Sequence, residues 1–315
     1  MAVPNRWPRV VAIVGPTASG KSAVGLELAQ RIGAEVVNAD AFQVYRGMDI
    51  GTAKVPVTQR HGITHHLLDI LDISDDLSVA AYQQQGRAVL AELAAREIPA
   101  VVVGGSGLYI RALLDDLRFP GSDPAIRARW EQQLTELGAP GLHTVLAERD
   151  PQAAEHILPT NGRRIVRALE VGELTGQPFA AQLPHDGPPL IDHVSIGLDL
   201  DREGLDHRIQ LRVQAMFDAG FVDEVRHLLD HGLRAARTAS RALGYPQVID
   251  VIDGRVGIDQ AAADIVTGTR RFARRQQRWF RRDPRTAWLD AAADPQSTAS
   301  AIEVRLAEQA RTLDA

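Results

Sequence analysis

Short apolar runs alternate with helical stretches along the first third of the chain. Runs at 10–14, 35–38 and 100–103 have the length and composition of buried parallel strands, and a run at 193–200 repeats the pattern later. The segments between the first three runs, at 23–32 and 78–96, place apolar residues at the spacing of an amphipathic helix. Because strands that alternate with helices form parallel sheets, the pattern predicts an α/β core with helices flanking the sheet.

The pattern changes near Pro120, where the breaker cluster Gly121-Ser122-Asp123-Pro124 follows. Helical patterns and then a stretch rich in proline and glycine come next, at 125–137, 141–149, 161–175 and 178–189. We therefore expect an all-helical domain at 122–189, inserted between two parts of the core at 1–121 and 190–315. A long helical pattern spans 206–230, and the alanine-rich tail after Asp290 is expected to be helical or frayed.

A glycine-rich loop connects the first predicted strand to the first predicted helix. It reads Gly15-Pro16-Thr17-Ala18-Ser19-Gly20-Lys21-Ser22 and fits the phosphate-binding pattern G-x-x-x-x-G-K-[ST]. Backbone amides at the helix start point toward a bound anion, Lys21 adds a positive charge, and the hydroxyl of Ser22 suits Mg²⁺. The motif in this context predicts a P-loop NTPase-like core that binds a diphosphate group, either of a nucleotide or of another molecule.

A carboxylate and a second glycine-rich turn follow the next two strands. Asp40 comes after the strand at 35–38, and Gly104-Gly105-Ser106-Gly107 follows the strand at 100–103. Because ligands of parallel sheets bind beyond the carboxyl ends of the strands, both should face the phosphate-binding loop. Asp40 suits proton transfer or water-mediated binding of Mg²⁺, although a carboxylate that only caps the next turn would give the same pattern.

Two groups of arginines lie on predicted helices. Arg163, Arg164 and Arg167 share one side of the helix at 161–175, and a solvated face explains them as well as a phosphate-binding face does. Arg208 and Arg212 lie one helical turn apart on the pattern at 206–230.

A third group of arginines is denser. At about 100° per residue, every arginine in 270–282 falls within roughly 140° of the helical wheel, with the aromatic residues on the other side. The members of this face include Arg270, Arg274 and Arg278, and no acidic residue interrupts it. A helix that only needs to be soluble normally mixes acids with bases, so the pattern favours binding of a nucleic acid, with the aromatic side packed on the core.

The composition narrows the class of protein. The chain has 315 residues, a net charge of −5 and no cysteine, which excludes disulfides and cysteine-based zinc sites. No run of about 18 apolar residues occurs, so we expect a cytoplasmic protein without membrane association. Without a coiled-coil pattern we expect a monomer. The adjacent His65 and His66 lack a third ligand at a suitable spacing, which favours a structural or loop role over metal binding.

Seven segments follow one another in a characteristic order. They read GPTASGKS (15–22), DAFQVYRGMDIGTAK (40–54), HHLLDI (65–70), VGGSGLYIRALL (103–114), NGRRIVRALEV (161–171), RIQLRVQAMFDAGFVDEV (208–225) and GTRRFARRQQRWFRR (268–282). Together they resemble the bacterial tRNA dimethylallyltransferase family over most of the chain. Some positions depart from the family pattern: Ala41 and Phe42 replace Ser followed by Met or Arg, Ser106 replaces Thr, Pro246 replaces a polar residue, and Arg278 stands where Thr is frequent.

The resemblance implies that the loop holds the diphosphate of dimethylallyl diphosphate and that N6 of an adenosine beside the anticodon of tRNA attacks the allylic carbon. In this scheme Asp40 is the general base, and Thr17, Lys21, Ser106 and Arg212 complete the catalytic set. The diphosphate is held by residues 15–22 with Arg208 or Arg212, of which Arg212 is favoured. Mg²⁺ binds Ser22, and Asp40 through water.

The same resemblance implies a set of residues that contact tRNA. They comprise Asp40, Ala41, Phe42, Gln43, Ser106, Arg127, Arg163, Arg164, Ile165, Val166, Arg167, Arg270, Arg274 and Arg278.

Two other functions fit parts of the pattern. A P-loop phosphotransferase would use Asp40 to deprotonate an acceptor hydroxyl and the insertion as a lid. A nucleic-acid-binding switch would bind a nucleotide without transferring anything. Two features distinguish these functions. A phosphotransferase that acts on a small metabolite does not require the arginine face at 270–282, and a switch protein does not require Asp40 opposite the phosphate-binding loop.

Overall fold

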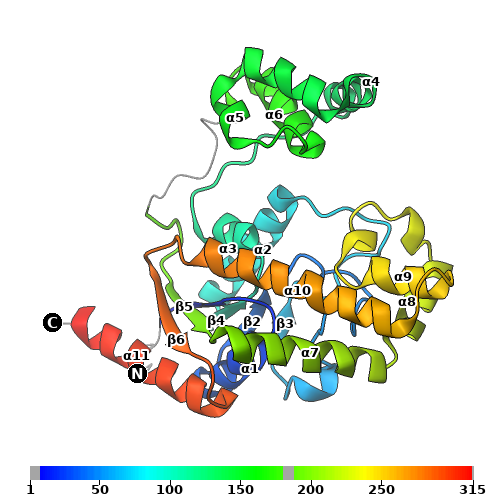
Figure 1. The fold of residues 1–315 in the computed structure, drawn as a ribbon. Coiled ribbons are helices and arrows are strands. Elements are labelled where there is room, and N and C mark those ends of the chain that lie inside the picture. The colour runs from blue at the N-terminus through cyan, green and yellow to red at the C-terminus, as the bar shows by residue number, and fades with distance from the viewer. Residues whose placement is uncertain (1–7, 180–187, 314–315) are drawn as a thin grey trace. The chain divides into compact units, whose positions relative to one another are not determined.

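The computed structural model describes residues 8–179 and 188–313 (Figure 1). The chain divides into two compact units, Met1–Asp115 with Pro188–Ala315, and Asp116–Gly187. The second unit overlaps the helical insertion predicted at 122–189, with its first boundary six residues earlier.

The first unit is built on a six-stranded sheet in which all neighbouring strands run parallel, in the order β3-β2-β4-β1-β5-β6. The strands are β1 (Val10–Val14), β2 (Glu35–Asn38), β3 (His65–His66), β4 (Ala100–Val103), β5 (Val194–Asp199) and β6 (Thr286–Asp290). The predicted parallel α/β fold of the P-loop type is confirmed. The apolar pattern missed β3 and β6, because β3 has only two residues and the apolar run within β6 has only three.

Helices cover both faces of this sheet, and β1 shows why. Val11 and Ile13 join a hydrophobic cluster with α1 (Lys21–Ile32) and α11 (Pro295–Leu313). Val10, Ala12 and Val14 join a cluster with α2 (Val79–Ala95) and α3 (Gly107–Leu114) on the opposite face. Since side chains alternate along a strand, a run that is apolar at every position is one that is buried on both faces.

Four helices and two short 3₁₀ segments pack around a second hydrophobic cluster of this unit. They are α7 (Arg202–Asp218), α8 (Phe221–Asp230), α9 (Tyr245–Ile252), α10 (Ile258–Phe280), η3 (Leu233–Ala235) and η4 (Ala239–Arg241). Another 3₁₀ segment, η1 (Val57–Gln59), has no buried residue. The prediction of one continuous helix over 206–230 is wrong. Gly220, with φ 94°, ends α7 and turns the chain into α8, which glycine does without steric cost.

The second unit is all-helical over its described residues, with α4 (Pro124–Arg149), α5 (Pro151–His156) and α6 (Gly162–Thr175). The two helices predicted at 125–137 and 141–149 are the two arms of α4, which is kinked at Gly138 (φ 68°, ψ 169°) ahead of Pro140. Trp130, Leu142 and Leu146 of α4 pack with the apolar side of α6 to form the core of this unit.

Candidate active site

The phosphate-binding loop joins β1 to α1, as predicted. Its backbone enters the left-handed region at Gly15 (φ 139°), Ala18 (φ 65°) and Gly20 (φ 89°). A side chain at Gly15 would come within 2.7 Å of the Leu198 carbonyl oxygen, which explains the glycine. Gly20 is the N-cap of α1 and no side chain caps that helix, so the amides of its first turn face the loop interior without a competing acceptor.

A cavity at the carboxyl ends of β1, β2 and β4 brings six of the predicted site residues together. These are Thr17, Lys21, Ser22, Asp40, Gln43 and Arg212. Sequence reasoning did not assign its other polar lining residues, Asn38, Thr52, His65 and Gln276. The remaining wall is largely apolar and consists of Val36, Ala53, Val55, Leu68 and Val103, with Gly104 and Gly105.

The two cations of this cavity influence each other. Burial lowers the pKa of Lys21 to about 7, with a further contribution from the Arg212 charge, and the Asp40 carboxylate opposes the shift. Burial also lowers the pKa of Arg212, again against the effect of Asp40. The Lys21 ammonium donates to the Pro16 carbonyl oxygen at 2.5 Å. One carboxylate offsets only part of the positive charge of these two buried cations. An anion that binds in the cavity therefore stabilises their charged forms.

Asp40 is held in place by its neighbours. Asn38 accepts a hydrogen bond from the Asp40 amide through Oδ1 and donates to the Asp40 carbonyl through Nδ2, at 3.0 and 3.1 Å. One carboxylate oxygen, Oδ1, accepts from the Phe42 amide at 2.9 Å. The turn-capping role that the sequence left open is therefore present, and the same side chain lines the cavity. Within the described chain, Oδ2 of Asp40 has no hydrogen-bond partner.

Gln276 of α10 is the main site residue that the sequence reasoning missed. It is 6% exposed, accepts from the Thr17 amide at 2.8 Å, and donates to the Gly105 carbonyl oxygen at 2.9 Å. It thereby ties the phosphate-binding loop to the second glycine-rich turn. A signal was available: at about 100° per residue, Gln276 falls on the aromatic side of the 270–282 wheel, where a polar residue needs buried partners.

The second glycine-rich turn owes its glycines to close contacts with the protein itself. A side chain at Gly104 would lie 2.2 Å from the Ala39 carbonyl oxygen, and one at Gly105 would meet Gln276 at the same distance. Ser106, predicted to bind the adenosine, lies outside the cavity lining. Its hydroxyl accepts from the Ala41 amide at 3.2 Å and so fixes the chain directly after Asp40.

The structure separates the two arginines predicted for the diphosphate. Arg212 lines the cavity and donates to the Thr52 carbonyl oxygen at 3.3 Å. Arg208 lies outside the cavity lining and donates to the Ala291 carbonyl oxygen at 3.0 Å, with its other nitrogen 3.7 Å from the position of a Cβ at Gly20. Arg212 is therefore the better placed of the two.

The cavity lining offers few ligands of its own for a magnesium ion. Among the described residues no group of three or more acidic, histidine or cysteine side chains is arranged to hold a metal. Asp40 is the one carboxylate among the lining residues, and Ser22 is one of three hydroxyl residues there, with Thr17 and Thr52. One hydroxyl and one carboxylate suit a Mg²⁺ ion that takes most of its ligands from a diphosphate and from water. The adjacent histidines do different work: His65 lines the cavity and His66 pairs with Glu35 at 2.5 Å.

The arginine face of α10 is partly neutralised. Arg270 pairs with Asp206 at 3.4 Å, and Arg281 pairs with Asp199 at 2.6 Å. Arg274 and Arg278 are exposed and have no acidic partner within the described chain. Together with Arg271, Arg275 and Arg282, which are also exposed, these two side chains are the part of the predicted nucleic-acid-binding face that remains open to a polyanion.

The aromatic side of α10 packs less completely than predicted. Phe280 is buried at 4% exposure, as expected for a residue that docks the helix on the core. Trp279 is 38% exposed, although its ring lies against Gly107, where a side chain would come within 2.0 Å of it. The prediction is correct for Phe280 and only half correct for Trp279.

The basic residues predicted in the second unit have different environments. Arg163 and Arg164 are exposed on α6. Arg127 and Arg167 instead pair with the buried Glu170, at 3.4 and 2.9 Å.

The neighbours of these arginines are also committed to the fold. Arg167 donates to the carbonyl oxygens of Pro120 and Gly121, at 2.7 and 3.1 Å. The side chains of Ile165 and Val166, which were included among the predicted tRNA contacts, are buried in the core of the unit. This assignment is corrected: the helical period that exposes Arg163 and Arg164 turns these two apolar residues inward.

Comparison with known proteins agrees with this geometry. The family model described as IPP transferase matches residues 43–283. A tRNA dimethylallyltransferase of Mycobacteroides abscessus is 56% identical over 284 residues, covering 89% of this chain and 91% of that protein. One of Streptomyces coelicolor is 54% identical over 303 residues, covering 96% of both.

Solved structures agree as well. A tRNA isopentenylpyrophosphate transferase of Bacillus halodurans has a TM-score of 0.70 at 36% identity, covering 97% of this chain and 99% of that chain. A eukaryotic dimethylallyltransferase, described as acting on tRNA, has a TM-score of 0.77 at 25% identity, covering 90% and 74%. A family match over most of the chain and relatives this similar over nearly full length place the protein: it belongs to the IPP transferase family.

Proposed function

We propose that this protein transfers a dimethylallyl group from dimethylallyl diphosphate to N6 of an adenosine next to the anticodon of tRNA, and releases diphosphate. The observation that carries the proposal is the cavity in which Asp40 lies beside Lys21 and Arg212 at the phosphate-binding loop. The apolar wall formed by Val36, Val55 and Leu68 suits a short hydrocarbon group attached to the anion.

The chemistry requires a base for the adenine proton and positively charged groups around the diphosphate. The lone pair of an exocyclic adenine amine is delocalised into the ring, so removing its proton as the new C–N bond forms assists the attack. Asp40 accepts that proton, and Oδ2 is the oxygen free to do so. As the allylic C–O bond breaks, negative charge grows on the diphosphate, where the loop amides, Lys21 and Arg212 stabilise it.

Magnesium fits the same scheme. Ser22, and Asp40 through water, would hold the ion against the diphosphate. When bound, Mg²⁺ supplies additional positive charge to the departing oxygens.

The adenosine must leave its stack to reach Asp40. The relatives' names support tRNA as the molecule that carries it. In the first unit, Arg274 and Arg278 offer unpaired positive charge for its phosphates, and in the second unit Arg163 and Arg164 do so. No helix of the described chain meets the length and apolarity that a membrane span requires.

One incubation tests the proposal. Purified protein with Mg²⁺ is given an unmodified anticodon stem-loop and either dimethylallyl diphosphate or ATP, and the nucleosides are then analysed by mass. We expect one adenosine to gain a five-carbon alkenyl group with dimethylallyl diphosphate alone. A phosphorylated product that forms with ATP would instead establish the phosphotransferase.

The pKa of Lys21 predicts a coupling between protonation and binding. In the free protein this pKa is lowered to about 7, so neutral lysine predominates as the pH rises above that value. A bound diphosphate raises the pKa again, because its charge favours the ammonium form. We therefore expect proton uptake on binding and weaker binding from pH 7 to pH 9. Titration calorimetry with inorganic diphosphate in buffers of different ionisation enthalpy measures the uptake. Lys21→Met reports the ligand's own protonation, and equal uptake by both proteins would refute the coupling.

The open arginines of α10 predict a change in salt dependence. Replacing Arg274 and Arg278 by Ala should weaken tRNA binding and reduce the slope of log K against log[salt] by about 0.7–0.9 for each lost phosphate contact. Filter binding over a range of salt concentrations measures this slope. Arg234→Ala with Arg255→Ala is the matched control, since both side chains are exposed on the same unit but pair with Asp253. A slope that changes equally in both double variants would show that net charge alone matters.

A further inference from the structure

One loop of the cavity wall, residues 49–54, is fixed from two sides by residues that have no part in the scheme above. The loop contributes Thr52 and Ala53 to the cavity. The carbonyl oxygen of Thr52 accepts hydrogen bonds from the guanidinium of Arg212 at 3.3 Å and from the side-chain amide of Gln43 at 3.1 Å. The position of this one oxygen therefore bears on two side chains that face the substrate.

The first anchor is Glu224 in the first turn of α8. One oxygen of its carboxylate accepts from the amides of Asp49 at 2.9 Å and Ile50 at 2.6 Å. The other accepts from the amide of Gly51 at 3.1 Å and from the Tyr245 hydroxyl at 2.8 Å. Three successive amides directed at one carboxylate define the path of the loop far more tightly than a single hydrogen bond would.

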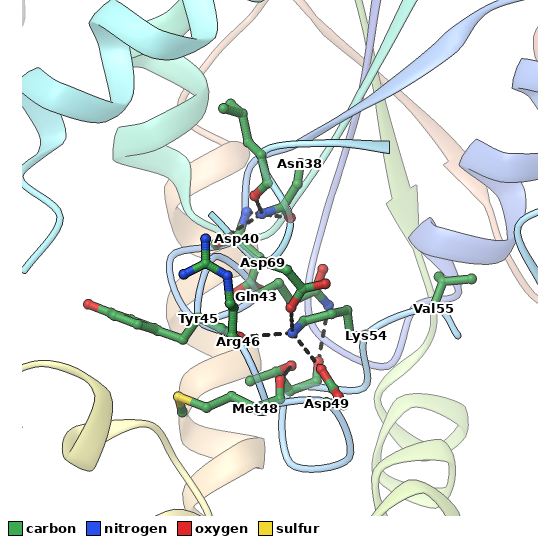
Figure 2. A network of polar contacts seen from close by, with 12 residues as sticks. Asn38, Asp40, Gln43, Tyr45, Arg46, Met48, Asp49, Lys54, Val55 and Asp69 are labelled. Atoms are coloured by element: carbon green, nitrogen blue, oxygen red, sulfur yellow. Dashed lines mark hydrogen bonds and ion pairs between the residues drawn. The ribbon is translucent and has the colours of Figure 1, made fainter. Parts of the chain in front are cut away.

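The second anchor is Lys54, whose ammonium group lies at the centre of the network in Figure 2. The side chain is 3% exposed, and its Nζ contacts Asp49 and Asp69 at 2.5 Å each and the Tyr45 carbonyl oxygen at 2.9 Å. An ammonium group has three N–H donors, so this head group is fully used. The network ties the end of the loop to Asp49 at its start and to the segment that precedes Ile70.

The packing beneath the loop leaves little freedom. A side chain at Gly51 would lie 2.4 Å from the ring of Phe221 and 2.7 Å from that of Tyr245. Ala53 has a φ of 50°, a conformation that a non-glycine residue keeps only when its surroundings impose it. Both anchors therefore act on a segment already pressed against a buried aromatic pair.

We propose that Glu224 and Lys54 are positioning residues of the active site: by fixing residues 49–54 they place the Thr52 carbonyl oxygen, which in turn orients Arg212 and Gln43 in the cavity. Neither residue lines the cavity itself. The diphosphate part of the inference stands on binding alone, and only its kinetic part rests on the proposed function.

A double-mutant cycle on inorganic diphosphate binding tests the route through Arg212. Calorimetry gives Kd for the full-length protein, Glu224→Ala, Arg212→Ala and the double variant. We expect Glu224→Ala to weaken binding about tenfold in the parent, and less than about twofold once Arg212 is absent, because the effect needs that side chain. Lys54→Met replaces Glu224→Ala in a second cycle with the same expectation. Equal losses in both backgrounds, or no loss in the parent, would overturn the inference.

Two further variants guard against an effect on folding alone. Tyr245→Phe removes one of the four donors to the Glu224 carboxylate and leaves the three loop amides in place, so Kd should stay within about twofold of the parent value. Glu224→Gln preserves the shape of the side chain and one strong acceptor, and should give an intermediate Kd. Melting temperatures are measured alongside. Losses of binding that follow melting temperature instead of the Arg212 background would mean that the anchors serve stability only.

A kinetic measurement extends the test to the adenosine. With the stem-loop and dimethylallyl diphosphate, Lys54→Met should lower kcat about 10- to 100-fold, the cost of a misplaced catalytic group, while the Kd for tRNA stays unchanged. An unchanged kcat would contradict the positioning role. If the parent protein transfers no prenyl group, the proposed function fails while the diphosphate cycle still decides this inference.

Discussion

Asp40→Asn should lose nearly all prenyl transfer while tRNA binding is retained. Asparagine can still accept the hydrogen bond from the Phe42 amide and still be held by Asn38, so the turn at this position is preserved. What disappears is the proton acceptor for the adenine amine. Removal of a general base costs about 10²–10⁴-fold, so we expect a fall in kcat of that size in single-turnover assays.

Two further variants serve as controls for this result. Asp40→Ala removes both the base and the turn cap and should be at least as inactive. Asp72→Asn alters an exposed carboxylate that pairs with Arg46 outside the cavity, and should change kcat by less than about twofold. If Asp40→Asn turned over at a rate close to that of the parent, its role would be to cap the turn and another group would have to take the proton.

Lys21→Met and Arg212→Met should each slow the reaction by about 10²–10³-fold, the range found for a single group that stabilises a developing oxyanion. Both side chains are desolvated beside Asp40. Each substitution therefore removes a positive charge at a place where water cannot stabilise the diphosphate instead. Arg208→Met should cost less than Arg212→Met, because its guanidinium bonds the Ala291 carbonyl oxygen outside the cavity lining.

Steady-state kinetics with varied dimethylallyl diphosphate separates binding from chemistry. A fall in kcat with little change in KM means that these cations act chiefly on the leaving diphosphate, and a rise in KM alone means that they hold the ground state. Arg226→Met, an exposed arginine that pairs with Asp223 on α8, is the control. Near-normal kcat and KM in both Lys21→Met and Arg212→Met would refute this role of the two cations.

The sequence predicted the centre of the fold because its signals there are local. A strand that is apolar at every position, followed by the glycine-rich loop and an amphipathic helix, is a contiguous pattern of 10–32 that needs no distant partner. The same holds for the carboxyl end of β2, where Asp40 follows the strand by two residues. Topology then places these segments at the carboxyl ends of the strands, which is why Thr17, Lys21, Ser22 and Asp40 meet in one cavity. Arg212 reaches the same cavity from α7.

What the sequence did not predict depends on contacts between distant segments. Gln276 reaches the Thr17 amide across 259 positions, and Glu224 receives the amides of 49–51 from about 175 positions away. A glutamine or a glutamate in a sequence does not by itself indicate which distant backbone amides it will bind. The break between α7 and α8 was missed for another reason: a single glycine inside a strong helical pattern is usually tolerated, and only its positive φ reveals the turn.

The arginine face shows how a pattern read from the sequence can overestimate the positive charge of a surface. The segment 270–282 contains no acid, yet Asp206 and Asp199 reach Arg270 and Arg281 from α7 and β5. Charge in a sequence window is therefore an upper limit on the charge that a partner meets. The salt dependence of the Arg274 and Arg278 variants measures the contribution of two of the arginines that stay unpaired.

In the reaction proposed for this protein, the phosphate-binding loop holds a leaving group and not the phosphate of a nucleotide cofactor. The most direct measurement follows diphosphate release and adenosine alkylation together, in one reaction with dimethylallyl diphosphate, unmodified anticodon stem-loop and Mg²⁺, with no nucleotide present. We expect equal amounts of free diphosphate and N6-alkenyl adenosine at every time point. Absence of both products without ATP, or diphosphate release that does not depend on the stem-loop, would contradict it.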